Sequence, residues 1–474
     1  HVSALVCQRT TDEAEVVLSA KAIFVATGAK PNIAYEFEHR GTLHREGTDY
    51  RAYEEDDEQQ LHIVHPPLDQ HSKIPEFGPF TSYDKEGYRV SFLGDTHPVF
   101  HGSVVKAIAS AKRIYPKIIK SLQNSIKPLL DNNDYQRFAN HIADLFATSI
   151  VKIVRHTESV IELQVRAKMA AHNFQPGQFY RVQNFETSAV IVGNTRLQSE
   201  AMAMIGAEVD KTSGLISFMV LEQGASSRLF ATFKPGQHIS IMGPTGVRTK
   251  IPRDKETIMV IGGRLGAAQM QSIGPALRAA GNRVLYVAGF RNSKEVYNQA
   301  ALEAGADVIV WITEQGDPIP VNRPQDVSVT GDFVDLLADY ANGRLYSDNQ
   351  PPIPVNSVDR VFVTGTRHLV KKIQTARHSV LKSFFMPKTV FIASIYGPMQ
   401  CMLKGVCAQC LQWQIDPVTG QRTKAVFACS WQDQPMDIVD FRNLDERLAQ
   451  NRMQESLTNL WLDHLFAEYD VDRI

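Results

Sequence analysis

The sequence has almost no net charge and no long apolar run. Its 50 lysines and arginines balance 51 aspartates and glutamates, which leaves a formal net charge of −1 over 474 residues. Such a surface offers no field to attract nucleic acid or an anionic membrane. The longest apolar stretches, such as Thr257 to Ile261, are far shorter than the ~20 residues of a membrane-spanning helix. We therefore expect a soluble, cytoplasmic chain with no nucleic-acid partner and no membrane span.

A secretory signal is also lacking, and the first residue is His1, in what resembles the middle of a domain. We expect the sequence to be the C-terminal portion of a longer polypeptide. A length of 474 residues predicts about three domains. A hydrophobic content of 43% with 21% charged residues is typical of folded protein with an ample core.

Cysteine is scarce but strongly clustered. Only five cysteines occur, and four of them lie within 29 residues, at Cys401, Cys407, Cys410 and Cys429. A Cys-x2-Cys pair on a tight turn can place two thiolates on one side of the backbone, and a remote cysteine can complete a four-thiolate set. The asymmetric spacing favours a [2Fe–2S] cluster over a zinc site with two Cys-x2-Cys knuckles. Zinc and unligated thiols stay open as alternatives, and disulfides would require an oxidising compartment.

Two strands that end in glycine turns mark the first 115 residues. One β-rich run leads into Thr27-Gly28, and a second leads into Gly94-Asp95 and then an alanine-rich helix. Turns at the carboxyl ends of strands are where open α/β sheets bind ligands. Backbone N–H groups at a helix start can bind a phosphate, and a carboxylate can accept hydroxyl hydrogen bonds. Each piece alone is weak, and a Gly-Asp after a strand is more often an ordinary turn.

In this order the two turns resemble the last third of two-dinucleotide-binding-domain flavoproteins, in particular the small subunit of glutamate synthase and its relatives. The resemblance implies that Thr27 and Gly28 end an NAD(P)H-binding insert. It also implies that Gly94 returns the chain to the FAD domain and that Asp95 binds the FAD ribityl. The N-terminal Gly-x-Gly-x-x-Gly motifs of that family are absent from the sequence.

Two further segments of this half carry no site. The polar stretch 36–84, with its acidic run 54–58, is expected to be a solvated excursion, and 116–148 to be a helical connector. The fifth cysteine, Cys7, is expected to be a buried structural thiol.

From residue 149 to 250 the apolar period changes to two. Five short β-rich runs separated by Pro-Gly and Gly-containing turns predict a small antiparallel barrel. Its specific marks are Pro176-Gly-Gln-Phe179, Gln223-Gly-Ala-Ser-Ser-Arg228, Pro235-Gly-Gln-His-Ile239 and Gly243-Pro-Thr-Gly246.

With the α/β segment that follows, these marks resemble the ferredoxin–NADP reductase superfamily, specifically the electron-transfer subunit of dihydroorotate dehydrogenase. The resemblance implies an FAD pyrophosphate on Gly224, Ser226 and Ser227. It further implies FAD contacts from the strand residues Gln178, Tyr180 and Arg181. The family's Arg-Pro-x-Ser strand is replaced here by Glu200-Ala-Met-Ala203. A carboxylate there repels a pyrophosphate, so Arg181 or Arg228 is expected to supply the missing positive charge.

Residues 251–395 alternate strands and helices with short connections, which predicts a doubly wound parallel sheet. The expected NAD(P)-binding glycines end its first and fourth strands: Gly262, Gly263, Gly266 and Gly365.

This domain departs from the resemblance at several positions. Arg264 and Gln269 stand where the family has a glycine and a proline, and Thr364-Gly-Thr366 replaces Cys-Gly-Pro. The arginine could bind a phosphate or occlude the nicotinamide path. Segment 322–350 is interpreted as an insertion or surface helix without chemistry.

A barrel, an α/β domain and a C-terminal [2Fe–2S] lobe occur in this order in the same dihydroorotate dehydrogenase subunit. They also do so in the small subunit of NADH-dependent ferredoxin:NADP oxidoreductases. The resemblance therefore implies that 396–440 form the lobe, with the four clustered cysteines as ligands. The family has four residues between the first two cysteines and this sequence has five, which leaves the role of Cys401 open. Residues 441–474 are expected to form an amphipathic helix that packs on its own chain, with a subunit contact as the alternative.

The predicted architecture is a multidomain α/β protein with a β-barrel. Its parts are the C-terminal part of an FAD/NAD(P)-binding domain (1–115), a connector (116–148), an FAD-binding barrel (149–250), an NAD(P)-binding-like domain (251–395), a [2Fe–2S] lobe (396–440) and a C-terminal helix (441–474).

The predicted activity is that of an NAD(P)H-dependent oxidoreductase containing FAD and an iron–sulfur cluster. Electrons would pass to an acceptor protein, such as ferredoxin, or to a small molecule, in a homo- or hetero-oligomer. Flavin is required because a hydride delivers two electrons and the cluster accepts one. The alternatives are a non-catalytic scaffold with a structural metal and a reductase component of a glutamate synthase-like complex.

Overall fold

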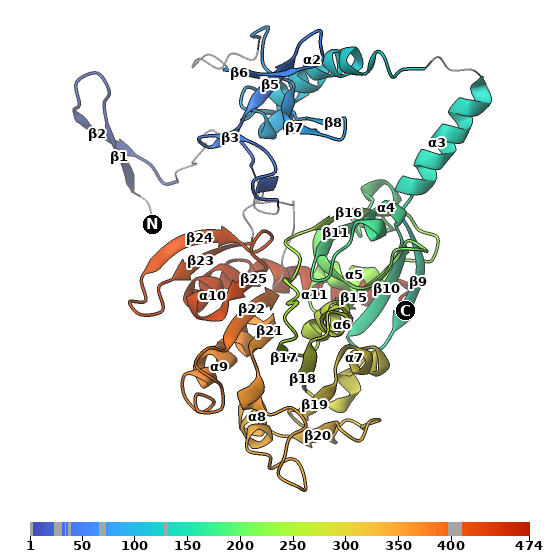
Figure 1. Ribbon diagram of the computed structural model, residues 1–474, viewed down its shortest axis with the longest axis vertical. Helices are drawn as coiled ribbons and strands as arrows, with labels where there is room; N and C mark the ends of the chain where they lie inside the picture. The colour runs from blue at the N-terminus through green and yellow to red at the C-terminus, as the bar shows by residue number, and fades with distance from the viewer. Residues whose placement is uncertain are drawn as a thin grey trace. The chain divides into compact units, whose positions relative to one another are not determined.

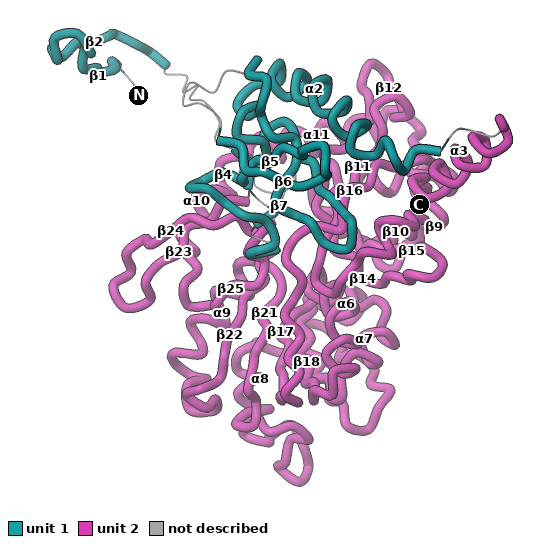
Figure 2. Tube along the Cα trace, turned by 45° about the horizontal axis from the view of Figure 1, so that its top comes forward, with its two compact units in different colours: residues 1–128 teal, residues 129–474 magenta. Residues whose placement is uncertain are grey.

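The structure is a computed structural model that describes residues 3–22, 31–33, 35–36, 39–65, 73–127, 131–396 and 410–474. The chain divides into two compact units, residues 1–128 and 129–474 (Figure 2). Among the residues described, no helix combines the length and apolar character needed to cross a membrane.

Unit 1 is built from small antiparallel sheets and one long helix. Its strands are β1 (Ala4–Gln8), β2 (Glu15–Ser19), β3 (Arg45–Glu46), β4 (Asp49–Tyr50), β5 (Ala52–Glu55), β6 (Leu61–Val64), β7 (Phe80–Lys85) and β8 (Tyr88–Ser91). β1 pairs with β2, β3 with β4, and a four-stranded sheet has the order β6-β5-β7-β8. A 3₁₀ turn, η1 (Gly94–Thr96), precedes helix α2 (Val104–Leu122), whose first turn is capped by the Ser103 side chain.

Two expectations for unit 1 are wrong. The described part of 36–84 is folded rather than a solvated excursion, because Tyr50 and Tyr53 are buried and the acidic run is tied to α2. Glu54 pairs with Lys117, and Asp57 lies 2.8 Å from the Lys120 Nζ. Cys7 lies in the two-stranded β1–β2 sheet and is only half-buried, since no further layer of described residues covers that hairpin.

Unit 2 begins with helix α3 (Asn132–Phe146) and an antiparallel barrel. The barrel strands are β9 (Ser149–Arg155), β10 (Val160–Arg166), β11 (Phe179–Asn184), β14 (Met202–Asp210), β15 (Leu215–Leu221) and β16 (Ile239–Thr245). Their order is β16-β11-β14-β15-β10-β9, and a bridge between Ser149 and His238 joins the two end strands. Alternate residues such as Leu163, Val165 and Phe218 fill the interior. The short elements are α4 (Lys168–His172), α5 (Ala225–Leu229) and the hairpin β12 (Ile191–Val192) with β13 (Thr195–Arg196).

A seven-stranded sheet follows the barrel. Its strands are β17 (Thr257–Gly262), β18 (Arg283–Phe290), β19 (Val308–Thr313), β20 (Val327–Thr330), β21 (Arg360–Thr366), β22 (Val390–Tyr396) and β25 (Asp433–Pro435), in the order β20-β19-β18-β17-β21-β22-β25. All pairs are parallel except β22 with β25. The predicted doubly wound parallel sheet is therefore present, with one antiparallel strand added at its edge.

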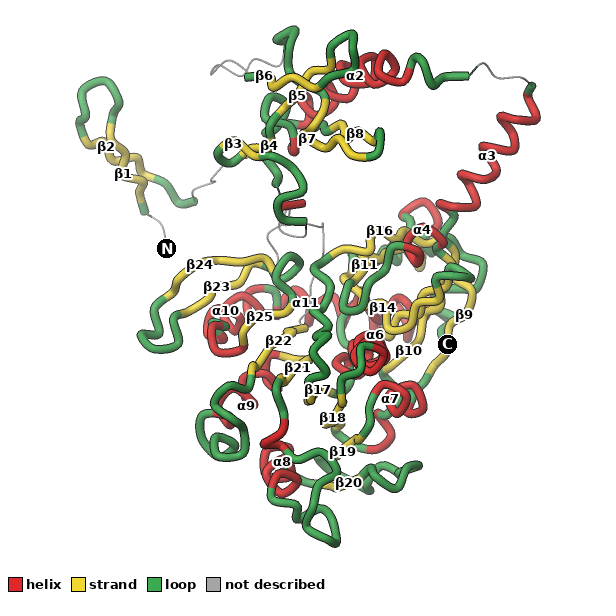
Figure 3. Tube along the Cα trace, in the orientation of Figure 1, coloured by secondary structure: helices red, strands yellow, loops and turns green. Residues whose placement is uncertain are grey.

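Helices cover both faces of this sheet (Figure 3). Helices α6 (Leu265–Ala279) and α7 (Gln299–Gly305) pack in one apolar cluster with the sheet, and α8 (Phe333–Ala341) and α9 (Arg367–Arg377) pack in another. Segment 322–350 is thus not a surface insertion: it supplies edge strand β20 and helix α8. Phe333, Leu337 and Tyr340 of α8 are buried, a pattern that the Pro and Asp content of the segment obscured.

The last part of the chain packs on both domains of unit 2 (Figure 1). Strands β23 (Leu411–Ile415) and β24 (Arg422–Phe427) form a hairpin, and the tail contains helices α10 (Phe441–Gln450) and α11 (Arg452–Glu468) instead of one helix. Phe441 and Leu444 join the core of the α/β domain, whereas Leu462 and Leu465 pack on the barrel. The lobe is therefore not a separate domain, since β25 belongs to the seven-stranded sheet.

Candidate functional site

The glycines predicted to bind NAD(P) converge at the carboxyl ends of β17 and β21. A Cβ atom on Gly263 would lie 1.6 Å from the Gly289 carbonyl oxygen, and one on Gly266 would lie 2.4 Å from the Thr364 carbonyl oxygen. Gly262 and Gly365 flank the same place, and Gly365 has a φ of 148°. Only glycine permits this close approach of helix α6 to the strands.

Arg264 begins α6 with a φ of +50°, inside the left-handed region. Its Nε atom lies 3.6 Å from the Glu295 Oε2, and its carbonyl oxygen accepts a hydrogen bond from the Tyr297 hydroxyl. Glu295 thus partly neutralises the positive charge of Arg264, the residue that could bind a phosphate.

A buried polar cluster lies beside these glycines. The side chain of Gln269 is fully buried in α6, and its Oε1 accepts hydrogen bonds from Thr364 Oγ1, at 2.5 Å, and from the Tyr396 hydroxyl. Burial raises the pKa of Tyr396, so this hydroxyl stays protonated. Gln269 and Thr364, which stand where the similar proteins have a proline and a cysteine, therefore bind each other. The sequence alone did not indicate that they touch.

The segment before β25 extends the polar cluster toward the barrel. Ser394 donates a hydrogen bond to Asp433 Oδ1, and Gln432 Nε2 donates to the Gly177 carbonyl oxygen of the barrel at 2.6 Å. Asp433 Oδ2 is buried without a hydrogen-bond partner among the described residues. Burial raises the pKa of the Asp433 carboxyl, because the charged form is poorly solvated there.

Cys410 and Cys429 lie on the outer face of the barrel. Cys410 and Cys429 are 8% and 3% exposed and pack in one apolar cluster with Phe179 of β11. Arg181 is on the same face of β11, because side chains two residues apart in a strand share a face. Its Nη1 lies 3.7 Å from the Met242 sulfur. The structure thus brings together the cysteine lobe and the strand predicted to contact FAD.

The two cysteines also contact each other. The Cys429 backbone N–H points at the Cys410 Sγ with a nitrogen-to-sulfur distance of 3.5 Å, and the β23–β24 hairpin holds both residues in place. Sulfur atoms that accept backbone N–H hydrogen bonds suit thiolate ligands of an iron–sulfur cluster. Cys401 and Cys407 lie outside the described residues. Within the described part, no group of three or more Cys, His, Asp or Glu side chains could hold a metal.

The Gly224 turn lies at the start of α5. Ser227 Oγ accepts a hydrogen bond from the Gly224 N–H at 3.0 Å, and Ser226 Oγ accepts one from the Glu200 N–H at 3.0 Å. The Ala225 N–H donates to a carboxylate oxygen of Glu455, also at 3.0 Å. The Ala225 N–H of the turn thus binds an anionic oxygen, the kind of acceptor that a pyrophosphate also offers.

Two other residues predicted in the barrel have structural partners. Gln178 Nε2 donates to the Gly246 carbonyl oxygen at 2.9 Å. Tyr180 is completely buried in the barrel core, and its hydroxyl donates to the Ala170 carbonyl oxygen at 3.1 Å. In this structure Tyr180 is a core residue and not part of a surface that a cofactor could reach.

In unit 1, Gly94 has a φ of +61°, and its N–H donates to the Ser110 Oγ at 2.9 Å. Asp95 is exposed, and its Oδ1 accepts the Gly102 N–H at 3.0 Å, just before α2. An exposed carboxylate at this helix entry fits a ligand hydroxyl. Thr27 and Gly28 lie outside the described residues.

Sequence reasoning missed His97, two residues after Asp95. It is fully buried, its Nε2 lies 3.0 Å from the Gly78 carbonyl oxygen, and its Nδ1 accepts the Val99 N–H at 3.1 Å. Burial lowers its pKa to about 4, so the ring is neutral at pH 7. The sequence indicated its burial only through the nearby Phe92 and Phe100.

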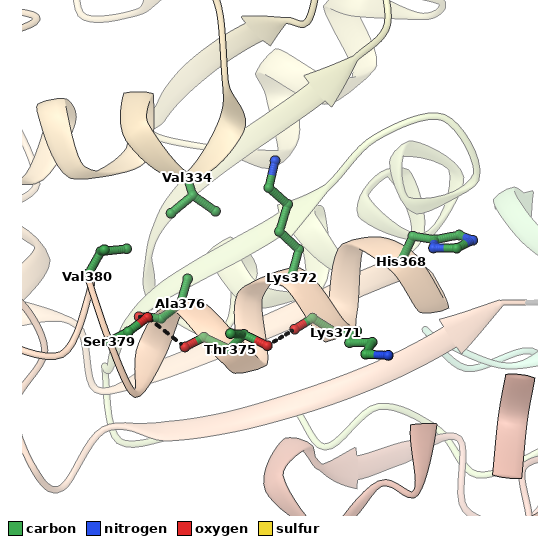
Figure 4. Close-up of a pocket in the computed structure, with 8 residues that line it drawn as sticks. All are labelled: Val334, His368, Lys371, Lys372, Thr375, Ala376, Ser379 and Val380. Atoms are coloured by element: carbon green, nitrogen blue, oxygen red, sulfur yellow. Dashed lines mark hydrogen bonds between the residues drawn. The ribbon is translucent and has the colours of Figure 1, made fainter. Parts of the chain in front are cut away.

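A cavity of 480 Å³ runs along α9, on the face of the sheet that α8 and α9 cover (Figure 4). Lys372 extends from α9 near Val334 of α8, and its Nζ lies 2.7 Å from Asp332. Lys371 is 3.8 Å from Asp445. No predicted site residue lines this cavity, and its lysines serve ion pairs between elements.

No protein-family model matches the chain. An uncharacterised protein of Rickettsia prowazekii is 29% identical over 381 residues, which are 80% of this chain and 42% of that protein. The electron-transfer subunit of dihydroorotate dehydrogenase B (NAD(+)) from Bacillus velezensis is 25% identical over 155 residues, 32% of this chain and 57% of the subunit. A homologue of that subunit in Thermotoga maritima is 24% identical over 168 residues, covering 35% and 55%. The chain thus spans about half the length of these curated relatives.

Among solved structures, a chain of an NADH-dependent reduced ferredoxin–NADP oxidoreductase, solved in work on flavin-based electron bifurcation, aligns with a TM-score of 0.52. The identity is 20%, and the match covers 67% of this chain and 98% of the other. The aligned part of the chain has a fold of the ferredoxin reductase type. The predicted succession of antiparallel barrel and parallel sheet is confirmed at this level.

Proposed function

We propose that the chain is an electron-transfer oxidoreductase in which NAD(P)H, FAD and a [2Fe–2S] cluster exchange electrons with an acceptor protein or small molecule. The observation that carries the proposal is the contact between Cys410, Cys429 and Phe179, on the barrel face that also bears Arg181. A cluster held there would lie against the flavin-binding face of the ferredoxin reductase fold. The relatives named as electron-transfer subunits support the same reading.

Each part of the site has a defined task in this proposal. The glycines at the ends of β17 and β21 let α6 begin close against the strands, at the sheet edge where a dinucleotide would bind, and Arg181 supplies positive charge beside the barrel. The four clustered cysteines, Cys401 and Cys407 included, are the proposed ligands. A flavin between them would convert the two electrons of a hydride into single-electron transfers.

In unit 1, we propose that Gly94 and Asp95 bind a second FAD, with Thr27 and Gly28 near an NAD(P)H-binding segment. The exposed Asp95 carboxylate beside α2 supports this assignment. A reductase that serves a glutamate synthase-like reaction would use the same groups.

A non-catalytic scaffold is the competing function. Glu200 on the barrel and the Arg264–Glu295 pair favour it, because both weaken the positive potential that a dinucleotide requires. In this case the cysteines would hold a structural zinc.

Metal and flavin analysis of the purified chain separates these functions. We expect about two irons and acid-labile sulfide per chain, and a visible spectrum that dithionite bleaches. Cys410→Ser and Cys429→Ser should each lose the iron, whereas Cys7→Ser, in the β1–β2 hairpin, should keep it. Stoichiometric zinc in a colourless protein would contradict the proposal.

A further inference from the structure

The C-terminal helix α11 lies on the Gly224 turn of the barrel. Glu455, in the first turn of α11, accepts the Ala225 N–H at 3.0 Å. A Cβ atom on Gly224 would lie 2.4 Å from the Glu455 Oε1, so the carboxylate fills the space directly above the glycine. A larger residue at position 224 would force the Glu455 carboxylate to move away.

The rest of α11 continues over the same part of the barrel. Arg228 Nη1 donates to the Asn459 Oδ1 at 3.0 Å, and the guanidinium also pairs with Asp463. Leu462 and Leu465 are buried in an apolar cluster whose other buried members are Ala225, Leu229, Val192 and Leu197. The helix therefore covers the surface between α5 and the β12–β13 hairpin.

The chain end is fastened to the barrel as well. Lys234 pairs with Asp472, and the Ile474 N–H donates to the Ala231 carbonyl oxygen at 3.0 Å. The contacts of the tail with the barrel thus extend from Glu455 to the last residue.

Helix α11 contacts the Gly224 turn, to which the sequence resemblance assigns the pyrophosphate of the FAD in the proposed function. A carboxylate oxygen and a phosphate oxygen both accept hydrogen bonds from backbone N–H groups, and both are negatively charged. They cannot bind the Ala225 N–H together without strong repulsion. Arg228, one of the two arginines that could compensate for Glu200, is engaged by Asn459 and Asp463 in the docked state.

We propose that Glu455 takes the place of the FAD pyrophosphate, so that docking of α11 and binding of FAD to the barrel are mutually exclusive. The tail is then a built-in competitor: with α11 docked the barrel is closed to the dinucleotide. With α11 released, the Gly224 turn and Arg228 become accessible together. This inference rests on the proposed function, because it concerns the same FAD site.

Titration of the full chain with FAD, followed by quenching of flavin fluorescence, tests the competition. Glu455→Ala should bind FAD at least tenfold more tightly than the wild type, and Glu455→Gln should lie between them because it loses the charge but keeps an acceptor. Glu468→Ala is the matched control: it removes an exposed carboxylate from the other end of α11 and should leave the affinity unchanged.

Limited trypsin digestion provides a readout specific to the barrel. FAD should accelerate cleavage after Arg452, at the start of α11, in the wild type and in Glu468→Ala. Equal FAD affinity in all variants, or FAD bound without increased cleavage, would overturn the proposal. If no variant binds FAD, the competition is also refuted. Iron and sulfide in the same samples then decide separately whether the redox function survives.

Discussion

At the residue scale, the groups that matter most are polar side chains whose neighbours come from distant parts of the sequence. The clustered cysteines and the glycine turns were recognisable from spacing alone. Gln269, Asp433 and Glu455 were not, because each meets its partners only after the domains have packed. Sequence spacing reports local geometry, whereas these contacts join residues more than 35 positions apart.

His97 should make the stability of unit 1 depend on pH. Its folded-state pKa of about 4 lies below the unfolded value of 6.5, so the unfolded chain binds a proton first as the pH falls. We expect the free energy of unfolding to drop by about 3 kcal/mol between pH 6.5 and pH 4 and then to level off. All four tryptophans, Trp311, Trp413, Trp431 and Trp461, lie in unit 2, so amide hydrogen exchange of unit 1 is the suitable measurement.

The matched variant is His97→Gln, which removes the titrating ring and should flatten this pH dependence. NMR titration of His97 should give a pKa near 4. A value near 6.5 would show that the ring is hydrated and that the buried arrangement is wrong.

Asp433 should make stability depend on pH in the direction opposite to His97. Its pKa is raised in the folded state, so the folded chain keeps a proton that the unfolded chain has lost, and stability falls as the pH rises through the folded-state pKa. Asp433→Asn retains the acceptor for Ser394 and should remove this loss. Denaturant unfolding followed by tryptophan fluorescence should show Asp433→Asn at least as stable as the wild type at pH 8, with a smaller pH slope.

At the element scale, the sequence predicted most strands of the barrel and of the parallel sheet because both periodicities were regular. The elements that it missed are those with mixed composition. A helix in segment 322–350 was only one of two alternatives, and its buried face was not foreseen because of the aspartates beside it. The tail proved to be two helices that separate at Asn451. The helix that follows the Gly262–Gly263 turn was predicted at the right place, because a glycine turn after a buried strand indicates where the next element begins.

The packing of α6 against the sheet predicts a severe effect of one methyl group. Gly263→Ala would place Cβ 1.6 Å from the Gly289 carbonyl oxygen, which is backbone and cannot rotate away. We expect a loss of more than about 3 kcal/mol in unfolding free energy, or failure to fold. Gly305→Ala is the control: its Cβ would meet the flexible Met270 Cε at 3.3 Å, and stability should change little.

At the scale of the whole chain, the succession of a barrel and a parallel sheet was predictable from the sequence, whereas the place where the α/β domain ends was not. The lobe and tail were expected to follow the α/β domain as additions. Instead Met436, Phe441 and Leu444 complete its core, and β25 completes its sheet. Composition could not indicate this, because an apolar residue after a loop does not show which domain it will pack against.

Two truncations should therefore behave differently. A chain that ends at Tyr396 loses β25 and the core residues of α10, and we expect it to aggregate or melt at a much lower temperature. A chain that begins at Leu129 keeps every apolar core cluster of unit 2 and should melt cooperatively. Calorimetry of the soluble fractions measures both. Equal melting temperatures would show that the lobe does not contribute to the α/β core.

The antiparallel pairing of β25 with β22 also has a consequence for biosynthesis. β22 leaves the ribosome well before β25, so its outer edge stays without a hydrogen-bonded neighbour while the cysteine segment is still being translated. An unpaired strand edge invites association with other nascent chains. Chaperone protection of the emerging polypeptide would therefore be needed during this interval.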